Sequence, residues 1–144
     1  MNRINVVVTG HGTFATGIQG ALNLLVKVPD NWQFVDFSSG MSDEKLKENL
    51  DKAINTFDGE TLLFTDLVGG TPYKVAATLA TEKSGLAVVS GCNLGSLLEA
   101  LFKNYSDVDA FANDLIDISK KGTQIFDVTD IKPTTSTDTY SDGI

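Results

Sequence analysis

Short apolar runs alternate with amphipathic segments along most of the chain. Four runs rich in β-branched and aromatic residues have the length of strands, at 4–8, 33–37, 61–65 and 86–90. Between and after them, apolar residues recur every three or four positions, as they do on the buried face of a helix. This spacing predicts helices over 14–25, 43–57, 72–84, 93–101 and 107–121, and a short fifth strand over 123–128.

Residues that favour helix ends flank these segments. Ser42 and Thr71 have side chains that cap helix N-termini, and Pro72 suits a first helical position, where its missing N–H is not needed. Gly59 and Gly85 stand where C-terminal caps are expected. Capping residues therefore predict both the first and the last residues of the second and third helices.

Strands that are apolar throughout and alternate with helices are typical of an α/β fold, in which helices cover both faces of a mostly parallel sheet. Right-handed crossovers predict the strand order 2-1-3-4 and a ligand crevice between the first and third strands, at their carboxyl ends. The loops at this edge are TGHGTFATG, DLVGGTPYK and SGCNLGS. We therefore expect the three glycine-richest turns to meet at one place.

Length and composition agree with a single domain. The chain has 144 residues, of which 42% are hydrophobic and 21% charged, enough for one sizeable core. We place this domain at 1–128. The remaining segment, 129–144, is too polar to bury and is predicted to be a disordered tail or a linker.

The net charge of −8 argues against a nucleic-acid partner or an anionic membrane surface, because both require clustered Lys and Arg. The single cysteine, Cys92, allows no intramolecular disulfide and is interpreted as a small, half-buried residue. No segment resembles a signal peptide or a membrane span, so a cytoplasmic location is expected. Trp32, which follows Pro29, is expected at the surface or in an interface, and no role is assigned to it.

Candidate chemistry lies in the first two glycine-rich loops. His11, the one histidine of the chain, follows the first strand, and Asp66 ends the third. On adjacent parallel strands the carboxylate can accept one imidazole N–H, which fixes the tautomer and leaves the other ring nitrogen as a nucleophile. The glycine at position 12 leaves room for a bulky group to approach the ring.

The segment GGTP adds a candidate anion site. Gly69 and Gly70 free the backbone to direct N–H groups one way, and Thr71 begins a helix whose N-terminal donors favour a phosphate-sized anion. A nucleophilic histidine, an orienting aspartate and a cradle for phosphoryl oxygens together describe a phosphohistidine carrier.

Other interpretations remain open at this point. Gly10, Gly12 and Ala15 match the dinucleotide-binding fingerprint G-x-G-x-x-[GA], with Asp36 as the ribose-binding acid. Against it, a histidine between the glycines occupies the place of the pyrophosphate. The same loops also fit turns without chemistry, or a regulatory module. A hydrolase is disfavoured because G-x-S-x-G is absent, and a metal site because no histidine or cysteine cluster exists.

Three separated segments resemble the enzyme IIA domain of the mannose family of the bacterial phosphotransferase system (PTS): VVVTGHGTFATGIQGAL, LLFTDLVGGTPYKVAA and VVSGCNLGSLLEAL. They occur in the family's order and spacing, and the resemblance extends over 4–128. Similar domains occur in transcriptional regulators and in dihydroxyacetone kinase components. Some family members also carry a IIB domain on the same chain, and 129–144 resembles the start of such a linker.

The resemblance implies that His11 accepts a phosphoryl group from the phosphocarrier HPr and passes it to IIB, which serves the membrane components IIC and IID. It implies that Asp66 orients His11 and that the backbone around Gly70 and Thr71 holds the phosphoryl oxygens. No cofactor or metal is implied. Family members are typically homodimers, and in some a C-terminal strand, here 123–128, is exchanged between subunits.

Overall fold

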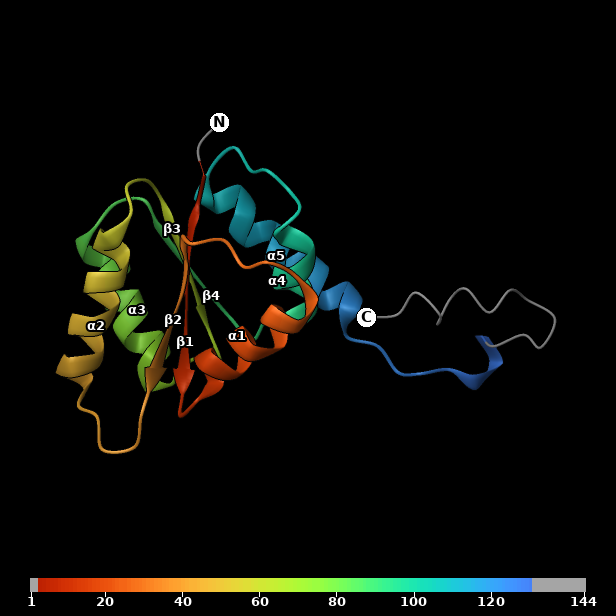
Figure 1. The fold of residues 1–144 in the computed structure, drawn as a ribbon, viewed down its shortest axis with the longest axis horizontal. Coiled ribbons are helices and arrows are strands. Elements are labelled where there is room, and N and C mark those ends of the chain that lie inside the picture. Colours follow the sequence, from red (N-terminus) through yellow and green to blue (C-terminus); the bar gives the residue numbers. More distant parts are fainter. Residues whose placement is uncertain (1–2, 131–144) are drawn as a thin grey trace.

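Four parallel strands form the central sheet, in the order β2-β1-β3-β4 (Figure 1). The computed structural model describes residues 3–130. The strands are β1 (Asn5–His11), β2 (Trp32–Phe37), β3 (Thr61–Thr65) and β4 (Leu86–Ser90). The α/β class, the parallel pairing and the strand order agree with the prediction.

Helices cover both faces of this sheet (Figure 1). They are α1 (Phe14–Leu25), α2 (Asp43–Thr56), α3 (Thr71–Glu82), α4 (Leu94–Ala100) and α5 (Val108–Gly122). One hydrophobic cluster joins the sheet to α1, α4 and α5, and a second joins it to α2 and α3. Every helix within residues 3–130 is too short or too polar to cross a bilayer.

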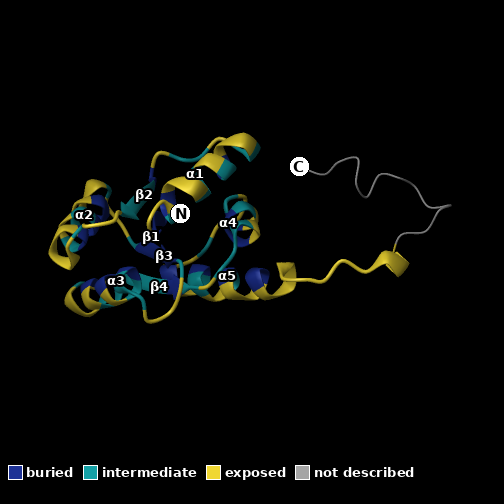
Figure 2. Ribbon diagram, turned by 90° about the horizontal axis from the view of Figure 1, so that it is seen from below, coloured by how far each residue is buried: buried dark blue, intermediate teal, exposed yellow. Residues whose placement is uncertain are grey.

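The strand β1 lies between these two clusters. Val6 and Val8 belong to the cluster under α1, α4 and α5, whereas Val7 faces α2 and α3. All three are fully buried, because alternate side chains of a central strand face opposite covered sides of the sheet. This position explains the unbroken apolar run. Figure 2 shows the buried central strands between edge strands of intermediate burial and partly exposed helices.

Backbone pairing carries β1 beyond its apolar run. Gly10 pairs with Asp36 and His11 pairs with Phe37, so His11 ends the strand rather than following it. A side chain at position 10 has no space, because a Cβ there would lie 2.5 Å from a ring atom of Phe14. Gly10 therefore allows the strand and the start of α1 to pack closely.

One of the two predicted helix starts needs correction. Ser42 accepts the N–H of Lys45 as expected, but the N-cap of α3 is Gly70, and Thr71 already lies in the helix. The Gly70 carbonyl accepts the N–H of Lys74, which places the first helical turn one residue earlier than a Thr71 cap requires. No side chain caps this N-terminus.

The glycines expected as C-caps lie in the turns after α2 and α3. Those helices end at Thr56 and Glu82, whereas Gly59 and Gly85 have φ angles of +102° and +77°. The left-handed conformation, which glycine adopts without strain, turns the chain into the next strand. The glycine signal therefore marked the connection rather than the cap.

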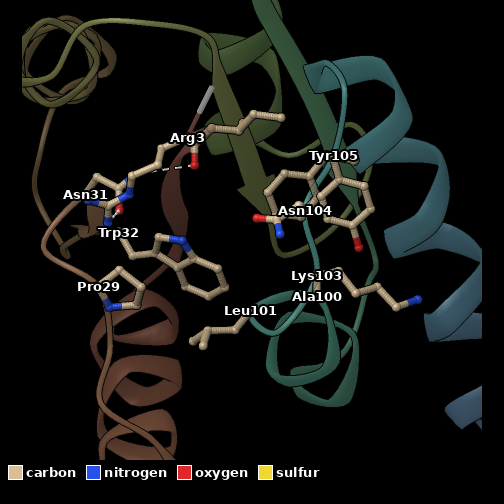
Figure 3. A pocket seen from close by; sticks show the side chains of 11 residues that line it. Arg3, Pro29, Asn31, Trp32, Ala100, Leu101, Lys103, Asn104 and Tyr105 are labelled. Carbon is tan, nitrogen blue, oxygen red and sulfur yellow. Dashed lines mark hydrogen bonds between the residues drawn. The ribbon is translucent and has the colours of Figure 1, made fainter. Parts of the chain in front are cut away.

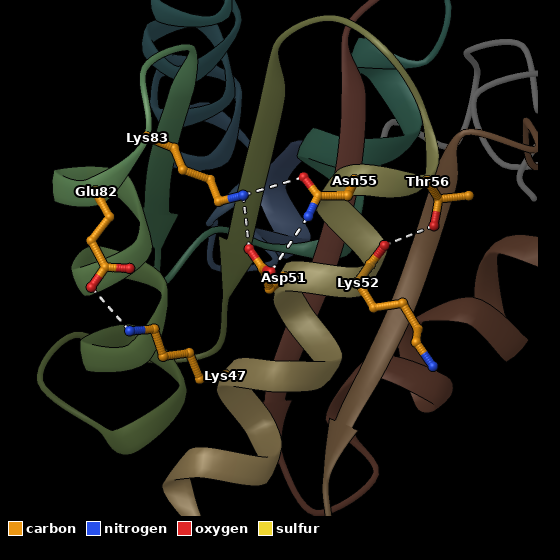
Figure 4. A network of polar contacts seen from close by, with 7 residues as sticks. All are labelled: Lys47, Asp51, Lys52, Asn55, Thr56, Glu82 and Lys83. Atoms are coloured by element: carbon orange, nitrogen blue, oxygen red, sulfur yellow. Dashed lines mark hydrogen bonds and ion pairs between the residues drawn. The ribbon is translucent and has the colours of Figure 1, made fainter.

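Surface ion pairs connect α2 to α3 on one side of the molecule (Figure 4). Lys47 contacts Glu82 at 2.9 Å, and Lys83 contacts Asp51 at 2.9 Å. Asn55 accepts a further hydrogen bond from Lys83. Pairs this exposed contribute at most about 1 kcal/mol each, so the apolar cluster beneath them holds the two helices in place.

The fifth strand predicted over 123–128 is wrong for this chain alone. Residues 123–127 are irregular, and Val128–Asp130 form a 3₁₀ turn, η1. The segment leaves the body of the domain (Figure 1), so it has no neighbouring strand with which to form a ladder. Most of the expected tail, 131–144, lies outside the described residues.

The exposed position expected for Trp32 is also wrong. Its side chain is 8% exposed and belongs to the cluster under α1, α4 and α5. It begins β2 next to the central strand, where its ring reaches the core. The half-buried position expected for Cys92 is confirmed.

Candidate functional site

His11 and Asp66 meet at the carboxyl edge of the sheet. His11 ends β1, and Asp66 directly follows β3, the neighbouring strand. The His11 Nδ1 atom lies 2.7 Å from Asp66 Oδ2, and the His11 backbone N–H donates to the same oxygen at 2.9 Å. The imidazole is 47% exposed, whereas the carboxylate is only 11% exposed. The pair therefore presents the ring to solvent and keeps the carboxylate behind it.

The Asp66 carboxylate is held at both of its oxygens. The Leu67 N–H donates to Oδ1 at 2.9 Å, while His11 occupies Oδ2. Burial raises the pKa of Asp66, but the hydrogen bonds from His11 and Leu67 outweigh it and hold the pKa below the ordinary 3.8. Because Asp66 is a carboxylate, the proton that joins the pair is on Nδ1 of His11, and in the neutral imidazole the lone pair is then on Nε2.

Gly70 lies against the free edge of the His11 ring. A Cβ at position 70 would be 2.6 Å from Cε1 and 3.3 Å from Nε2 of the histidine. The backbone conformation of Gly70 is one that any residue adopts, so it is the nearby ring that requires glycine. The N-terminus of α3, which starts at Thr71, is therefore placed beside Nε2.

The remaining predicted residues of the loops lie on either side of this contact. Gly12 and Gly69 have φ angles of +60° and +84°, and a Cβ at either position would meet no atom within 4 Å. Neither turn therefore crowds the neighbouring side chains. His11, Asp66 and Gly70 are in direct contact, with Gly12, Gly69 and Thr71 adjoining them in the chain.

Sequence reasoning missed three apolar residues of the site, one that packs on the ring and two that follow Asp66 in the chain. Phe37 packs edge-on against His11, with ring centroids 6.1 Å apart. Leu67 and Val68, which follow Asp66, are half exposed or more. The strand order contained the signal for Phe37, since the last residue of β2 pairs with the last residue of β1.

The third glycine-rich loop serves a structural purpose. Asn93 caps α4 by accepting the N–H of Ser96, and its amide donates to the Ser119 carbonyl of α5. Burial raises the pKa of Cys92, against a smaller opposite effect of a hydrogen bond with Ser119. Among the described hydrogen bonds, none joins this loop to His11 or Asp66.

The dinucleotide-binding fingerprint is used for packing. Phe14 covers Gly10, and the Asp36 carboxylate accepts hydrogen bonds from the backbone N–H and the hydroxyl of Thr16, at 3.0 and 2.7 Å. Asp36 thus satisfies a first-turn donor of α1, so both of its oxygens are engaged away from any ribose. Within residues 3–130, no three His, Cys, Asp or Glu side chains are grouped to hold a metal ion.

Comparison with known proteins agrees with this geometry. The family model EIIA-man, "PTS system fructose IIA component", matches residues 5–116. The fructose-specific EIIA component of Bacillus subtilis is 28% identical over 125 residues, which cover 85% of this chain and 86% of the relative. The mannose-specific EIIAB component of Escherichia coli is 26% identical over 106 residues, and this chain spans only 33% of its length.

Solved structures extend the similarity to the fold. The crystal structure of phosphotransferase system component EIIA from Streptococcus agalactiae matches with a TM-score of 0.79 and 31% sequence identity. The match covers 90% of this chain and 100% of the Streptococcus agalactiae chain. The mannose/sorbose-specific IIA subunit from Enterococcus faecalis has a TM-score of 0.81 at 23% identity, covering 88% and 97%, which shows the shared fold. The chain belongs to the EIIA-man family, the IIA components of the sugar phosphotransferase system.

Proposed function

We propose that His11 is the phosphoryl carrier of this EIIA component, and that Nε2 is the atom phosphorylated. The donor is phospho-HPr, and the acceptor is the IIB component of a mannose-family transporter. The observation that carries the proposal is the 2.7 Å contact between His11 Nδ1 and Asp66, which leaves Nε2 exposed beside the start of α3.

The proposed reaction exchanges one N–P bond for another. The Nε2 lone pair of His11 attacks the phosphorus of phospho-HPr, and the N–P bond of the donor breaks with its electron pair returning to the donor ring. The imidazole that results carries a positive charge, which the Asp66 carboxylate stabilises through Nδ1–H. Transfer to IIB is the same step with His11 as the leaving group.

The adjoining backbone suits the phosphoryl oxygens. The N-terminus of α3 has no side-chain cap and no acidic residue in its first turn, so its N–H groups and dipole are available to an anion. We assign phosphoryl binding to Gly12, Gly69, Gly70 and Thr71. Catalysis by this site consists of positioning and electrostatic stabilisation rather than acid–base chemistry.

The surface around His11 suits contact with carrier proteins. Leu67 and Val68 form an exposed apolar edge directly after Asp66, and such residues at an interface contribute by excluding water. The net charge of −8 favours a donor with a basic face, because complementary charge accelerates encounter. A protein partner is therefore better matched to this site than a small substrate.

We also propose that the segment after α5 joins two copies of the chain. Ile125, Phe126 and Val128 are 93%, 62% and 70% exposed, an arrangement that a second copy would remove from water. In the dimer this segment pairs with a strand of the other subunit. The functional domain then spans 1–128, and 129–144 is a tail or linker.

Phosphorylation with purified enzyme I, HPr and phosphoenolpyruvate tests the carrier assignment. Because His11 is the single histidine, one acid-labile and base-stable phosphoryl group per chain identifies it directly. His11→Gln is expected to take up none. Addition of IIB should then remove the label from the wild type. An equal, acid-labile label on His11→Gln, or a phosphorylated protein that does not discharge to IIB, contradicts the proposal.

A further inference from the structure

A second cleft opens at the end of the sheet opposite His11 (Figure 3). It has a volume of about 130 Å³ and lies between the start of β1, the turn before β2 and the segment that connects α4 to α5. Arg3 at its edge precedes His11 by eight residues of nearly continuous strand, which corresponds to roughly 25 Å. The cleft is therefore separate from the phosphoryl site.

A guanidinium group is fixed at the rim of this cleft. Arg3 Nη2 donates to the side-chain oxygen of Asn31 at 2.7 Å. Asn31 is 5% exposed, and its amide nitrogen donates to the Ile4 carbonyl and to Asn5 Oδ1. Because this buried amide cannot rotate without losing those bonds, it holds Arg3 in one place. The other guanidinium N–H groups have no acceptor among residues 3–130, so they are available to an anion.

The wall of the cleft supplies an aromatic surface and a further donor. The ring of Trp32 points into it (Figure 3), and its indole N–H has no hydrogen-bond acceptor within the described part of the chain. Tyr105 stacks on Phe111 with centroids 4.6 Å apart, and its hydroxyl donates to Asp114 at 2.6 Å. Leu101 adds an aliphatic side chain. The indole N–H is not among the fully buried side-chain donors without a partner, so it can donate to a ligand or to water.

The charge of the cleft is opposite to that of the whole chain. Although the net charge is −8, the lining residues include Arg3 and Lys103 and, among residues 3–130, no aspartate or glutamate. Lys103 is already paired with Glu99 and Asp114, at 3.2 and 3.0 Å. Arg3 is thus the cation that a ligand would meet.

We infer that this cleft binds a small organic carboxylate with one flat ring or a short planar chain. The carboxylate would lie on the Arg3 guanidinium, whose fork of donors matches it, and the planar part against Trp32 and Leu101. The volume agrees with one ring, because a cavity of about 150 Å³ in another protein holds benzene. The inference does not depend on the function of His11.

Benzoate is a suitable probe, and Trp32 is a built-in reporter because the chain has one tryptophan. We expect benzoate to change the Trp32 fluorescence saturably and to shift the indole N–H resonance in ¹H–¹⁵N spectra. The expected affinity is about millimolar, as for other single-ring ligands. Benzyl alcohol, which lacks the charge, and inorganic phosphate, which lacks the ring, should each bind about tenfold more weakly.

Two variants test the assigned contacts. Arg3→Gln should weaken benzoate binding about tenfold, while Lys52→Gln, the same charge change on the exposed face of α2, should not. Asn104→Asp puts a carboxylate at the rim of the cleft on an exposed residue and should also weaken benzoate binding. Equal affinity in Arg3→Gln and Lys52→Gln, equal binding of phosphate and benzoate, or no saturable response in either readout would overturn the inference.

Discussion

Replacement of Gly70 by alanine separates the geometry of the site from the stability of the fold. The added Cβ would lie 2.6 Å from Cε1 of His11, whereas carbon atoms pack at about 3.5–4.0 Å. The backbone of α3 holds position 70, so the half-exposed histidine ring has to move by about 1 Å. A displacement of this size costs roughly 100-fold in rate when a reacting atom must be aligned.

The same substitution should barely change the free energy of unfolding. Alanine adopts the φ and ψ of Gly70 without strain, and the lower entropy of the unfolded chain then stabilises by about 0.4–1 kcal/mol. A weakened contact between His11 and Asp66 costs about 0.5–1.5 kcal/mol, at the low end because the released groups reach water. We expect the two effects to cancel to within about 1 kcal/mol.

Rapid-quench transfer from phospho-HPr, beside a urea melt of each protein, measures both quantities. Gly20→Ala is the matched control, since a Cβ there meets no atom within 4 Å and position 20 lies on α1, away from the ring. It should transfer at the wild-type rate. If Gly70→Ala also transfers at the wild-type rate, the ring edge beside Gly70 is not the face that reacts, and Nε2 is wrongly assigned.

Further predictions concern two acidic residues, Asp66 and Asp36, and the segment after α5. Asp66→Asn should fold but slow transfer about 10- to 100-fold, because the ring loses its orienting carboxylate. Hydrogen bonds lower the pKa of Asp66 in the folded state, so the stabilisation by its carboxylate is complete above about pH 4 and is lost as the pH falls through the folded pKa. The free energies of unfolding of wild type and Asp66→Asn should therefore converge in urea melts at acid pH. A difference that stays constant with pH would contradict this. Asp36→Ala should cost about 1 kcal/mol in a urea melt through the lost contacts to Thr16, and an unchanged midpoint would refute that cap. Light scattering should give a dimer at micromolar concentration. Phe126→Ser should weaken this dimer, and deletion of 129–144 should leave it intact. A monomeric wild type would refute the proposal that the segment after α5 joins two copies.

The sheet could be predicted closely because its strands are buried on both sides. Strands β3 and β4 begin and end at the predicted residues, since their apolar runs stop where the chain turns. The end of β1 was missed because Gly10 and His11 join the ladder through backbone atoms, which no side-chain pattern reveals. The segment 123–128 was wrongly predicted to be a strand for the opposite reason, because its apolar pattern has no partner strand among residues 3–130.

Some features of the candidate site could also be predicted from the sequence, and others could not. His11, Asp66 and Gly70 could be predicted to meet, because residues at the carboxyl ends of neighbouring strands share one edge of the sheet. The role of Asp36 could not, since an acid at the end of the second strand satisfies the dinucleotide fingerprint and a helix cap equally well. The hydrogen bonds from Thr16 to Asp36 decide between them, and those bonds depend on how α1 packs against β2.

Two aspartates from the strands on either side of β1 hold the loop that carries His11. From β3, Asp66 accepts the His11 backbone N–H as well as the ring proton, and from β2, Asp36 accepts the Thr16 N–H and hydroxyl. The loop is thus fixed at its start and at its entry into α1, while a Cβ at Gly12 between them would meet no atom within 4 Å. A histidine held in this way can keep its ring in place when a partner protein docks. In-line transfer between two proteins requires a loop that is held rigidly at both ends and that carries no side chain beside the reacting ring.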